Sequence, residues 1–277
     1  MSTLANAVAV LRLFSAERPH LSVGEVTALL ALPKSSASRL LSAMRREGLL
    51  AQFGTTSRYC VGTLLFEIGR HVRGDAPLLA MADEALAASC RETGHTGYVS
   101  ILDGQDVMVV RMRHGTHALR VVTPLGSRAP AAETSTGRAL LARMSDDRLK
   151  RLYPTVPRPR SPNSPADYAQ LLAALSEVRR VGWCEAVDEA IPGVGSIAVA
   201  VGDPELGEQL SFCISYPAAT VGAPERQRII RLLTDAARSI GTRLKDPTWT
   251  GPERNARDGA APRNRRRGAT RAVAASS

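Results

Sequence analysis

Cysteine is scarce in this chain, and long apolar runs are absent. The four cysteines among 277 residues are widely spaced and form no C-x-x-C pair, which is typical of reduced thiols in a cytosolic protein. No apolar run approaches the roughly 20 residues that span a bilayer. The opening MSTLANAVAVLRLF also lacks the basic segment that begins a signal peptide. We therefore expect a soluble, cytoplasmic protein with no membrane partner.

Motifs of the common enzyme classes are also missing. The chain has no G-x-S-x-G, G-x-x-x-x-G-K-[ST], G-x-G-x-x-G or H-E-x-x-H. The only close histidine pair is His114 and His117, with no carboxylate or cysteine beside it, and we interpret it as a surface pair. The sequence therefore predicts no enzyme, no cofactor and no metal centre. Catalysis stays as the less favoured alternative.

Positive charge is concentrated at the two ends of the chain. Of a formal net charge of +10, residues 1–73 contribute nine Lys/Arg against four acidic residues, and residues 248–277 contribute seven Arg against two. The residues between them are balanced. This distribution indicates nucleic-acid contact at the ends. Because residues 247–277 are rich in Gly, Pro, Ala and Arg and have little to bury, we expect a disordered basic tail there.

Three short helices and a hairpin are predicted within residues 1–62. An apolar stripe over residues 4–14 predicts the first helix, and the S-x-x-E capping box of Ser22 and Glu25 begins the second. The third starts in the stretch LPKSSASRLL, and its apolar stripe consists of Ala37, Leu40, Leu41 and Met44. Strand-like runs at 49–53 and 58–61 follow. This is the plan of a winged helix-turn-helix, an all-α unit with a small β-wing.

The polar residues at the start of the third helix lie opposite its apolar stripe. In a helix-turn-helix this face enters the major groove, where hydroxyl and cationic side chains bond phosphates and base edges. We predict DNA contacts by Lys34, Ser35, Ser36, Ser38, Arg39, Arg45 and Arg58. A solvated polar face, or nonspecific nucleic-acid binding by the basic head and tail, remains the alternative.

The rest of the chain reads as a linker helix over residues 63–76 and a second domain over residues 77–246. Helical patterns occur at 78–91, 136–144, 146–152, 168–181 and 224–244. Strand-like runs occur at 96–102, 106–112, 118–123, 183–188, 196–201 and 208–215. Helices flanking about six mostly antiparallel strands make an α+β sensor-like domain.

The chain resembles the IclR family of bacterial transcription regulators over about residues 4–246. The resemblance rests on LPKSSASRLLSAMRREGLL and SRYCVGTLLFEIG, then on LGSRAPAAETSTGRALLA, GWCEAVDEAIPGVGSIAVAVGD and LSFCISYP, in the family's order and spacing. It implies an N-terminal winged helix-turn-helix and a C-terminal GAF-like α/β effector-binding domain. It also implies a homodimer or homotetramer on double-stranded, palindromic operator DNA, modulated by a small organic, often aromatic, acid.

The family's effector pocket maps onto eight residues of this chain. The resemblance assigns effector contacts to Ser135, Thr136, Gly137, Glu189, Gly195, Ser196, Cys213 and Ser215. The sequence departs from the family at three places. Ala131-Ala132-Glu133 stands in the segment where a histidine is usual, Arg138 stands where a lysine is usual, and Cys213 stands where a serine or another small residue is common.

The residues themselves also favour a ligand site. Free N–H groups where a helix opens at Thr136-Gly137 suit a carboxylate. Small and apolar residues around Ser196 and Cys213 suit a concave pocket with few polar anchors. The alternative is that the hydroxyls before the helix only cap it, and that Ser196 and Cys213 only fill a core.

Overall fold

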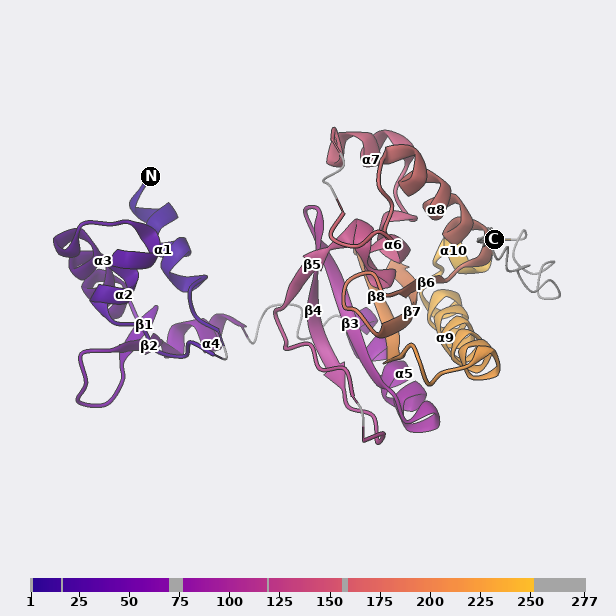
Figure 1. Cartoon of the computed structure of the whole chain (residues 1–277), viewed down its shortest axis with the longest axis horizontal. Helices are drawn as coiled ribbons and strands as arrows, with labels where there is room; N and C mark the ends of the chain where they lie inside the picture. The colour runs from indigo at the N-terminus through magenta and orange to yellow at the C-terminus, as the bar shows by residue number, and fades with distance from the viewer. Residues whose placement is uncertain (1, 16, 70–76, 119, 156–158, 252–277) are drawn as a thin grey trace, which may run out of the picture. The chain divides into compact units, whose positions relative to one another are not determined.

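The computed structural model describes residues 2–15, 17–69, 77–118, 120–155 and 159–251 (Figure 1). The chain divides into two compact units, Met1–Ala76 and Pro77–Ser277. The predicted α+β architecture is confirmed, with a helix-turn-helix in the first unit and a single large sheet flanked by helices in the second. No helix in the described part of the chain is long and apolar enough to cross a membrane.

The first unit has the predicted three helices and wing. Its elements are α1 (Thr3–Leu11), α2 (Val23–Leu30), α3 (Lys34–Arg46), β1 (Leu50–Gln52), β2 (Tyr59–Val61) and α4 (Thr63–Gly69). The capping box forms: the Glu25 N–H donates to the Ser22 hydroxyl, and the Ser22 N–H donates to the Glu25 carboxylate. Strands β1 and β2 pair antiparallel, with Leu50 opposite Val61.

The core of this unit follows the predicted stripe of α3 and only the second half of the stripe at residues 4–14. Ala37, Leu40, Leu41 and Met44 are all buried. Leu11 and Phe14 are half-buried and pack against the core, which also contains Val10. Leu4 is 74% exposed, so the start of α1 lies outside the core.

Helix α4 covers the first half of the predicted linker helix, and none of its described side chains is buried. Phe66 is 74% exposed and Ile68 is also exposed. Residues 70–76 of the predicted linker lie outside the described residues.

The second unit is built on a six-stranded antiparallel sheet. The strands are β3 (Thr96–Asp103), β4 (Asp106–Arg113), β5 (Arg128–Pro130), β6 (Cys184–Val187), β7 (Val194–Asp203) and β8 (Glu208–Pro217). Their order is β5-β4-β3-β8-β7-β6, so β3 and β8, far apart in sequence, are neighbours at the centre. In this register Tyr98 lies opposite Cys213, which brings residues from both halves of the unit onto one face.

Helices cover both faces of this sheet (Figure 1). They are α5 (Pro77–Thr93), the 3-10 turn η1 (Ala131–Glu133), α6 (Ser135–Leu141), α7 (Asp146–Leu152), α8 (Tyr168–Val181), α9 (Ala223–Leu244) and α10 (Pro247–Thr250). The α5 and α9 helices pack against each other and against the central strands, and α6 packs on the sheet beneath α8. One core cluster joins α6 and α8 to sheet residues that include Tyr98, Ala198 and Cys213.

The strand predicted at 118–123 does not form among the described residues there. The β-branched Val121, Val122 and Thr123 favour a strand, but here a side chain, and no neighbouring strand, bonds the backbone. The Tyr98 hydroxyl donates to the Val121 carbonyl and accepts from the Thr123 N–H. On the side of β4 away from β3, the pairing strand is β5, which begins at Arg128.

The predicted tail begins too early. Residues 247–250 form α10, and Trp249 is 5% exposed. The Trp249 indole N–H donates to the Ala200 carbonyl at 2.9 Å, and its ring packs where Gly241 leaves room. These contacts make α10 part of the second unit. Residues 252–277 of the predicted tail lie outside the described residues.

Candidate DNA-binding face and effector pocket

Helix α3 presents one polar face to solvent. Lys34, Ser35, Ser38 and Arg39 are exposed and Ser36 is half-buried, while the stripe on the opposite side packs in the core. Ser42, four residues after Ser38, is also exposed on this face, and it was not among the predicted DNA contacts. The helical spacing alone would have found it. Hydroxyl and cationic side chains on one helix face are suited to the major groove.

Arg45 ties the recognition helix to the wing. Its guanidinium donates to the Gln52 side-chain oxygen at 2.6 Å. The Gln52 amide in turn donates to the Thr56 carbonyl in the hairpin turn, also at 2.6 Å. Because these two bonds run from α3 through β1 to the turn, Arg45 helps to fix the wing beside the helix.

Arg58 ties the wing to the start of α2. Its guanidinium donates to the His20 carbonyl at 3.0 Å and to the Glu25 carboxylate at 2.8 Å. The N–H of Ser22, followed by Arg58, lowers the pKa of Glu25 to about 2. The guanidinium of Arg58, predicted to contact DNA, therefore already holds a structural pair. Phe53 stacks on His20 nearby, with ring centroids 3.8 Å apart.

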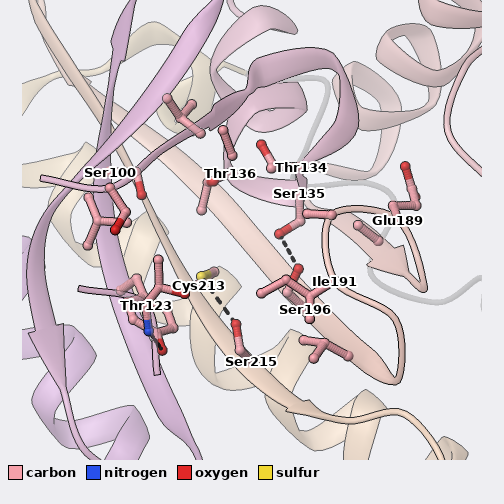
Figure 2. A pocket seen from close by; sticks show the side chains of 18 of the residues that line it. Ser100, Thr123, Thr134, Ser135, Thr136, Glu189, Ile191, Ser196, Cys213 and Ser215 are labelled. Carbon is pink, nitrogen blue, oxygen red and sulfur yellow. Dashed lines mark hydrogen bonds between the residues drawn. The ribbon is translucent and has the colours of Figure 1, made fainter. Parts of the chain in front are cut away.

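A pocket of about 260 Å³ opens on the sheet face next to the start of α6 (Figure 2). Strands β3, β4, β7 and β8 form its floor, and the segments before β5 and after β6 form its walls. Apolar side chains such as Val107, Val109 and Val194 alternate with hydroxyls. A cavity that is mostly apolar with a few polar anchors is the usual form of a small-molecule site.

Six of the eight predicted effector residues line this pocket, namely Ser135, Thr136, Glu189, Ser196, Cys213 and Ser215. Figure 2 shows the Ser135 and Ser196 hydroxyls joined by a hydrogen bond, which is 2.7 Å long. The Cys213 thiol lies 4.0 Å from the Ser215 hydroxyl. Burial raises the pKa of Cys213 to about 12, so this thiol is neutral at physiological pH.

The two predicted glycines are not among the lining residues. A Cβ on Gly137 would lie 2.1 Å from the Ala131 carbonyl oxygen, and one on Gly195 would lie 2.2 Å from the Tyr216 ring. The Gly137 N–H, expected to hold a carboxylate, donates to the Thr134 hydroxyl at 3.1 Å. Both glycines therefore allow close packing beside the pocket, and their ligand contacts stay a prediction.

Glu189 lines the pocket but its charge is already paired. The Arg138 guanidinium forms a two-pronged ion pair with it, and both side chains are buried. Arg138 also donates to the Ala132 and Glu185 carbonyls, and the Ser164 hydroxyl donates to Glu189. The arginine found in place of the family's usual lysine thus holds a buried carboxylate at the pocket wall.

Several lining residues were missed because they lie outside the family motifs or were not recognised as lining within them. Strands β3 and β4 and the segment after β4 contribute Tyr98, Ser100, Val107, Val109, Val121 and Thr123, the loop between α7 and α8 contributes Arg160, and the loop after β6 contributes Ile191. The period-two spacing of Tyr98 and Ser100 places both on one strand face. Only the pairing of β3 with β8, which the sequence does not give, places that face beside Cys213.

His114 and His117 are both exposed, in agreement with their interpretation as a surface pair. The His117 ring also lies against that of buried His95, with centroids 4.6 Å apart, and its Nε2 is 3.1 Å from the Thr93 carbonyl. Across the described ranges, no group of three or more His, Cys, Asp or Glu side chains is placed to hold a metal ion.

A helix-turn-helix with an exposed polar face, on the same chain as a domain with a ligand-sized pocket, defines a ligand-responsive transcription regulator. Residues 3–53 match the IclR helix-turn-helix domain, and residues 71–242 match the bacterial transcriptional regulator IclR C-terminal domain. The chain belongs to the IclR family, as its motifs had indicated.

Relatives and solved structures agree with this assignment. The regulator KdgR of Escherichia coli K12 is 26% identical over 245 residues, covering 88% of this chain and 93% of KdgR. The regulator XynR of the same organism is 27% identical over 252 residues, covering 89% and 98%.

Two solved structures share the fold at lower identity. An IclR regulator from Alicyclobacillus acidocaldarius has a TM-score of 0.75 at 21% identity, covering 87% of this chain and 97% of its own. An IclR homolog from Microbacterium hydrocarbonoxydans, complexed with 4-hydroxybenzoate, has a TM-score of 0.74 at 22% identity, covering 88% and 99%.

Proposed function

We propose that this regulator binds a palindromic operator as a homodimer or homotetramer and that a small organic acid in the pocket modulates this binding. The observation that carries the proposal is the combination, on one chain, of the polar α3 face and the hydroxyl-lined pocket. The 4-hydroxybenzoate bound by one structural relative supports an aromatic acid of similar size. As a transcription regulator, the protein would act in the cytoplasm by binding DNA and ligand, with no catalytic step.

The DNA contacts divide into two groups. Lys34, Ser35, Ser36, Ser38 and Arg39 meet base edges and phosphates in the major groove. Arg45 and Arg58 mainly hold the wing, because their guanidinium groups are bonded to Gln52 and Glu25. A second protomer places an equivalent helix one or more helical turns along the DNA, which requires a palindromic site.

The effector acts by thermodynamic linkage between the two domains. A ligand shifts DNA binding only if it binds one DNA-binding state more tightly than the other. Binding of the acid therefore either weakens or strengthens the binding of the protein to its operator. The same coupling makes operator DNA change the affinity for the acid by the same factor.

Fluorescence anisotropy on DNA from upstream of the protein's own gene tests this function. We expect much tighter binding to that DNA than to random DNA of equal length at moderate salt, and a change in affinity when 4-hydroxybenzoate or a related acid is added. A nonspecific nucleic-acid binder, the second candidate because of the basic ends, would bind both DNAs alike with a steep salt dependence.

A further inference from the structure

We propose that Arg160 binds the carboxylate of the effector, and that the effector is a monocarboxylate with an apolar body. This inference rests on the proposed role of the pocket as the effector site. Arg160 lies in the Pro-rich loop between α7 and α8, a segment outside the motifs that carry the family resemblance. It lines the pocket together with the strand residues.

The charges around the pocket single out Arg160. Three ionisable side chains of full charge line the cavity: Arg128, Glu189 and Arg160. Arg128 is paired with Asp103, and Glu189 is paired with Arg138. Arg160 is exposed, and within the described ranges its guanidinium has no ion-pair partner. Among the charged side chains that line the pocket, Arg160 is therefore the one without a described ion-pair partner.

The loop that carries Arg160 is fastened beside the pocket. The Arg160 backbone N–H donates to the buried Glu133 carboxylate at 3.2 Å. The Ser161 hydroxyl donates to the Asp188 carbonyl at 2.7 Å, and the Ser164 hydroxyl donates to Glu189 at 3.1 Å. Glu133, which departs from the family's usual histidine, thus anchors the loop and is a positioning residue for Arg160.

The remaining lining determines the class of ligand. Arginine presents a planar fork of donors that matches a carboxylate and can hold it through two parallel hydrogen bonds. Hydroxyls and aliphatic side chains make up most of the other lining, so a second carboxylate finds no free cation among the described lining residues. A cationic ligand would be repelled by Arg160. A singly charged acid with an apolar body fits both the charge and the volume of about 260 Å³.

The start of α6 is a weaker anchor for the carboxylate. This helix has only seven residues, and its Gly137 N–H is already bonded to the Thr134 hydroxyl. The neighbouring Ser135 and Ser196 hydroxyls bond each other and suit a neutral polar group on the ligand. Recognition of the ligand's charge therefore falls to Arg160.

Calorimetry with matched acid and amide probes tests the inference on the full-length protein. The probes are propionate and benzoate, their amides propionamide and benzamide, and the dianion terephthalate. We expect at least one monocarboxylate to bind about tenfold or more tightly than its amide, and terephthalate to bind less well than benzoate.

Three variants identify the residue responsible. Arg160→Gln should weaken binding of the acid by about tenfold or more and leave binding of the amide unchanged, and Arg160→Lys should recover part of the loss. Glu133→Leu should also weaken binding of the acid, because it removes the acceptor that anchors the Arg160 backbone. The control Arg148→Gln, an exposed arginine on α7, should have no effect.

Two outcomes would overturn the inference. One is equal binding of acids and amides, or an acid affinity that Arg160→Gln leaves intact. The other is that none of the acids binds while the same preparation still binds operator DNA specifically. Because operator binding is measured separately, both outcomes leave the proposed DNA-binding function standing.

Discussion

Arg138 donates two hydrogen bonds to the carboxylate of Glu189, and both side chains are buried at the pocket wall. Arg138 comes from the start of α6 and Glu189 from the loop after β6, 51 residues away. The pair therefore fixes one wall of the pocket to another. Isolated buried charges are costly, so each partner depends on the other.

Glu189→Gln should lower the free energy of unfolding by about 3–5 kcal/mol, because it leaves the Arg138 charge buried without a carboxylate. Urea denaturation followed by circular dichroism measures this loss. Glu177→Gln is the matched control, since its ion pair with Arg180 is half-exposed and a loss under about 1 kcal/mol is expected. Equal, small losses for both variants would show that the buried pair adds no stability.

Arg39→Ala should weaken binding to the specific operator by roughly 1–3 kcal/mol if the side chain bonds a base edge. Affinity for random DNA should change much less, so the ratio of the two affinities falls. Anisotropy titrations with both DNAs measure this ratio. The control is Arg231→Ala, an exposed arginine on α9. A parallel loss on both DNAs would assign Arg39 to the phosphates instead.

Arg58→Met should lower the melting temperature of the first unit, because it removes the donors to Glu25 and to the His20 carbonyl. The salt dependence of operator binding should stay unchanged. A phosphate contact would instead reduce the slope of log K against log salt by about 1. Melting curves and a salt titration together distinguish a wing anchor from a DNA contact.

His95 should make stability fall as the pH drops below about 6.5. Burial, followed by the charge of neighbouring His117, lowers the pKa of His95 below the ordinary histidine value of 6.5, against a smaller opposing effect of Glu225. The unfolded chain therefore takes up a proton at a pH where the native imidazole stays neutral, which favours unfolding. The melting temperature of wild type should fall more between pH 7.5 and 5.5 than that of His95→Gln. Parallel curves would contradict this.

The stability of the second unit should depend on α10 and not on residues 252–277. A chain that stops at residue 251 should melt like the full protein, bind its operator with the same site preference and show a flatter salt dependence, because it loses seven arginines. A chain that stops at residue 247 loses Trp249 and should be less stable by roughly 3–5 kcal/mol. Loss of site preference in the chain that stops at residue 251 would show that the tail specifies the operator.

Local sequence patterns correctly predicted the elements that are stabilised by contacts between residues close in sequence. The Ser22–Glu25 capping box and the stripe from Ala37 to Met44 form as expected, since both depend on residues three or four apart. Helices α7 and α8 begin and end at the predicted residues. The order and spacing of the family motifs indicated six of the pocket residues.

Long-range contacts decided the features that sequence reasoning missed. Trp249 stands in a segment of low-complexity composition, and its burial depends on Gly241 and Ala200, which no local pattern connects to it. The lining from β3 and β4 depends on the pairing of β3 with β8. The bonds of Arg58 to Glu25 span 33 residues, so an apparently free wing arginine proves to be engaged.

The hydroxyl of Tyr98 holds the pocket wall at Val121 and Thr123 without any sheet pairing at those residues. The residues that form this part of the pocket wall are therefore separate from the residues whose pairing builds the sheet. A substitution at Val121 or Thr123 would alter the pocket wall while the paired strands keep their register, because both residues are held through their backbone. Ligand preference can therefore be re-engineered at this segment with little cost to the folding of the sheet.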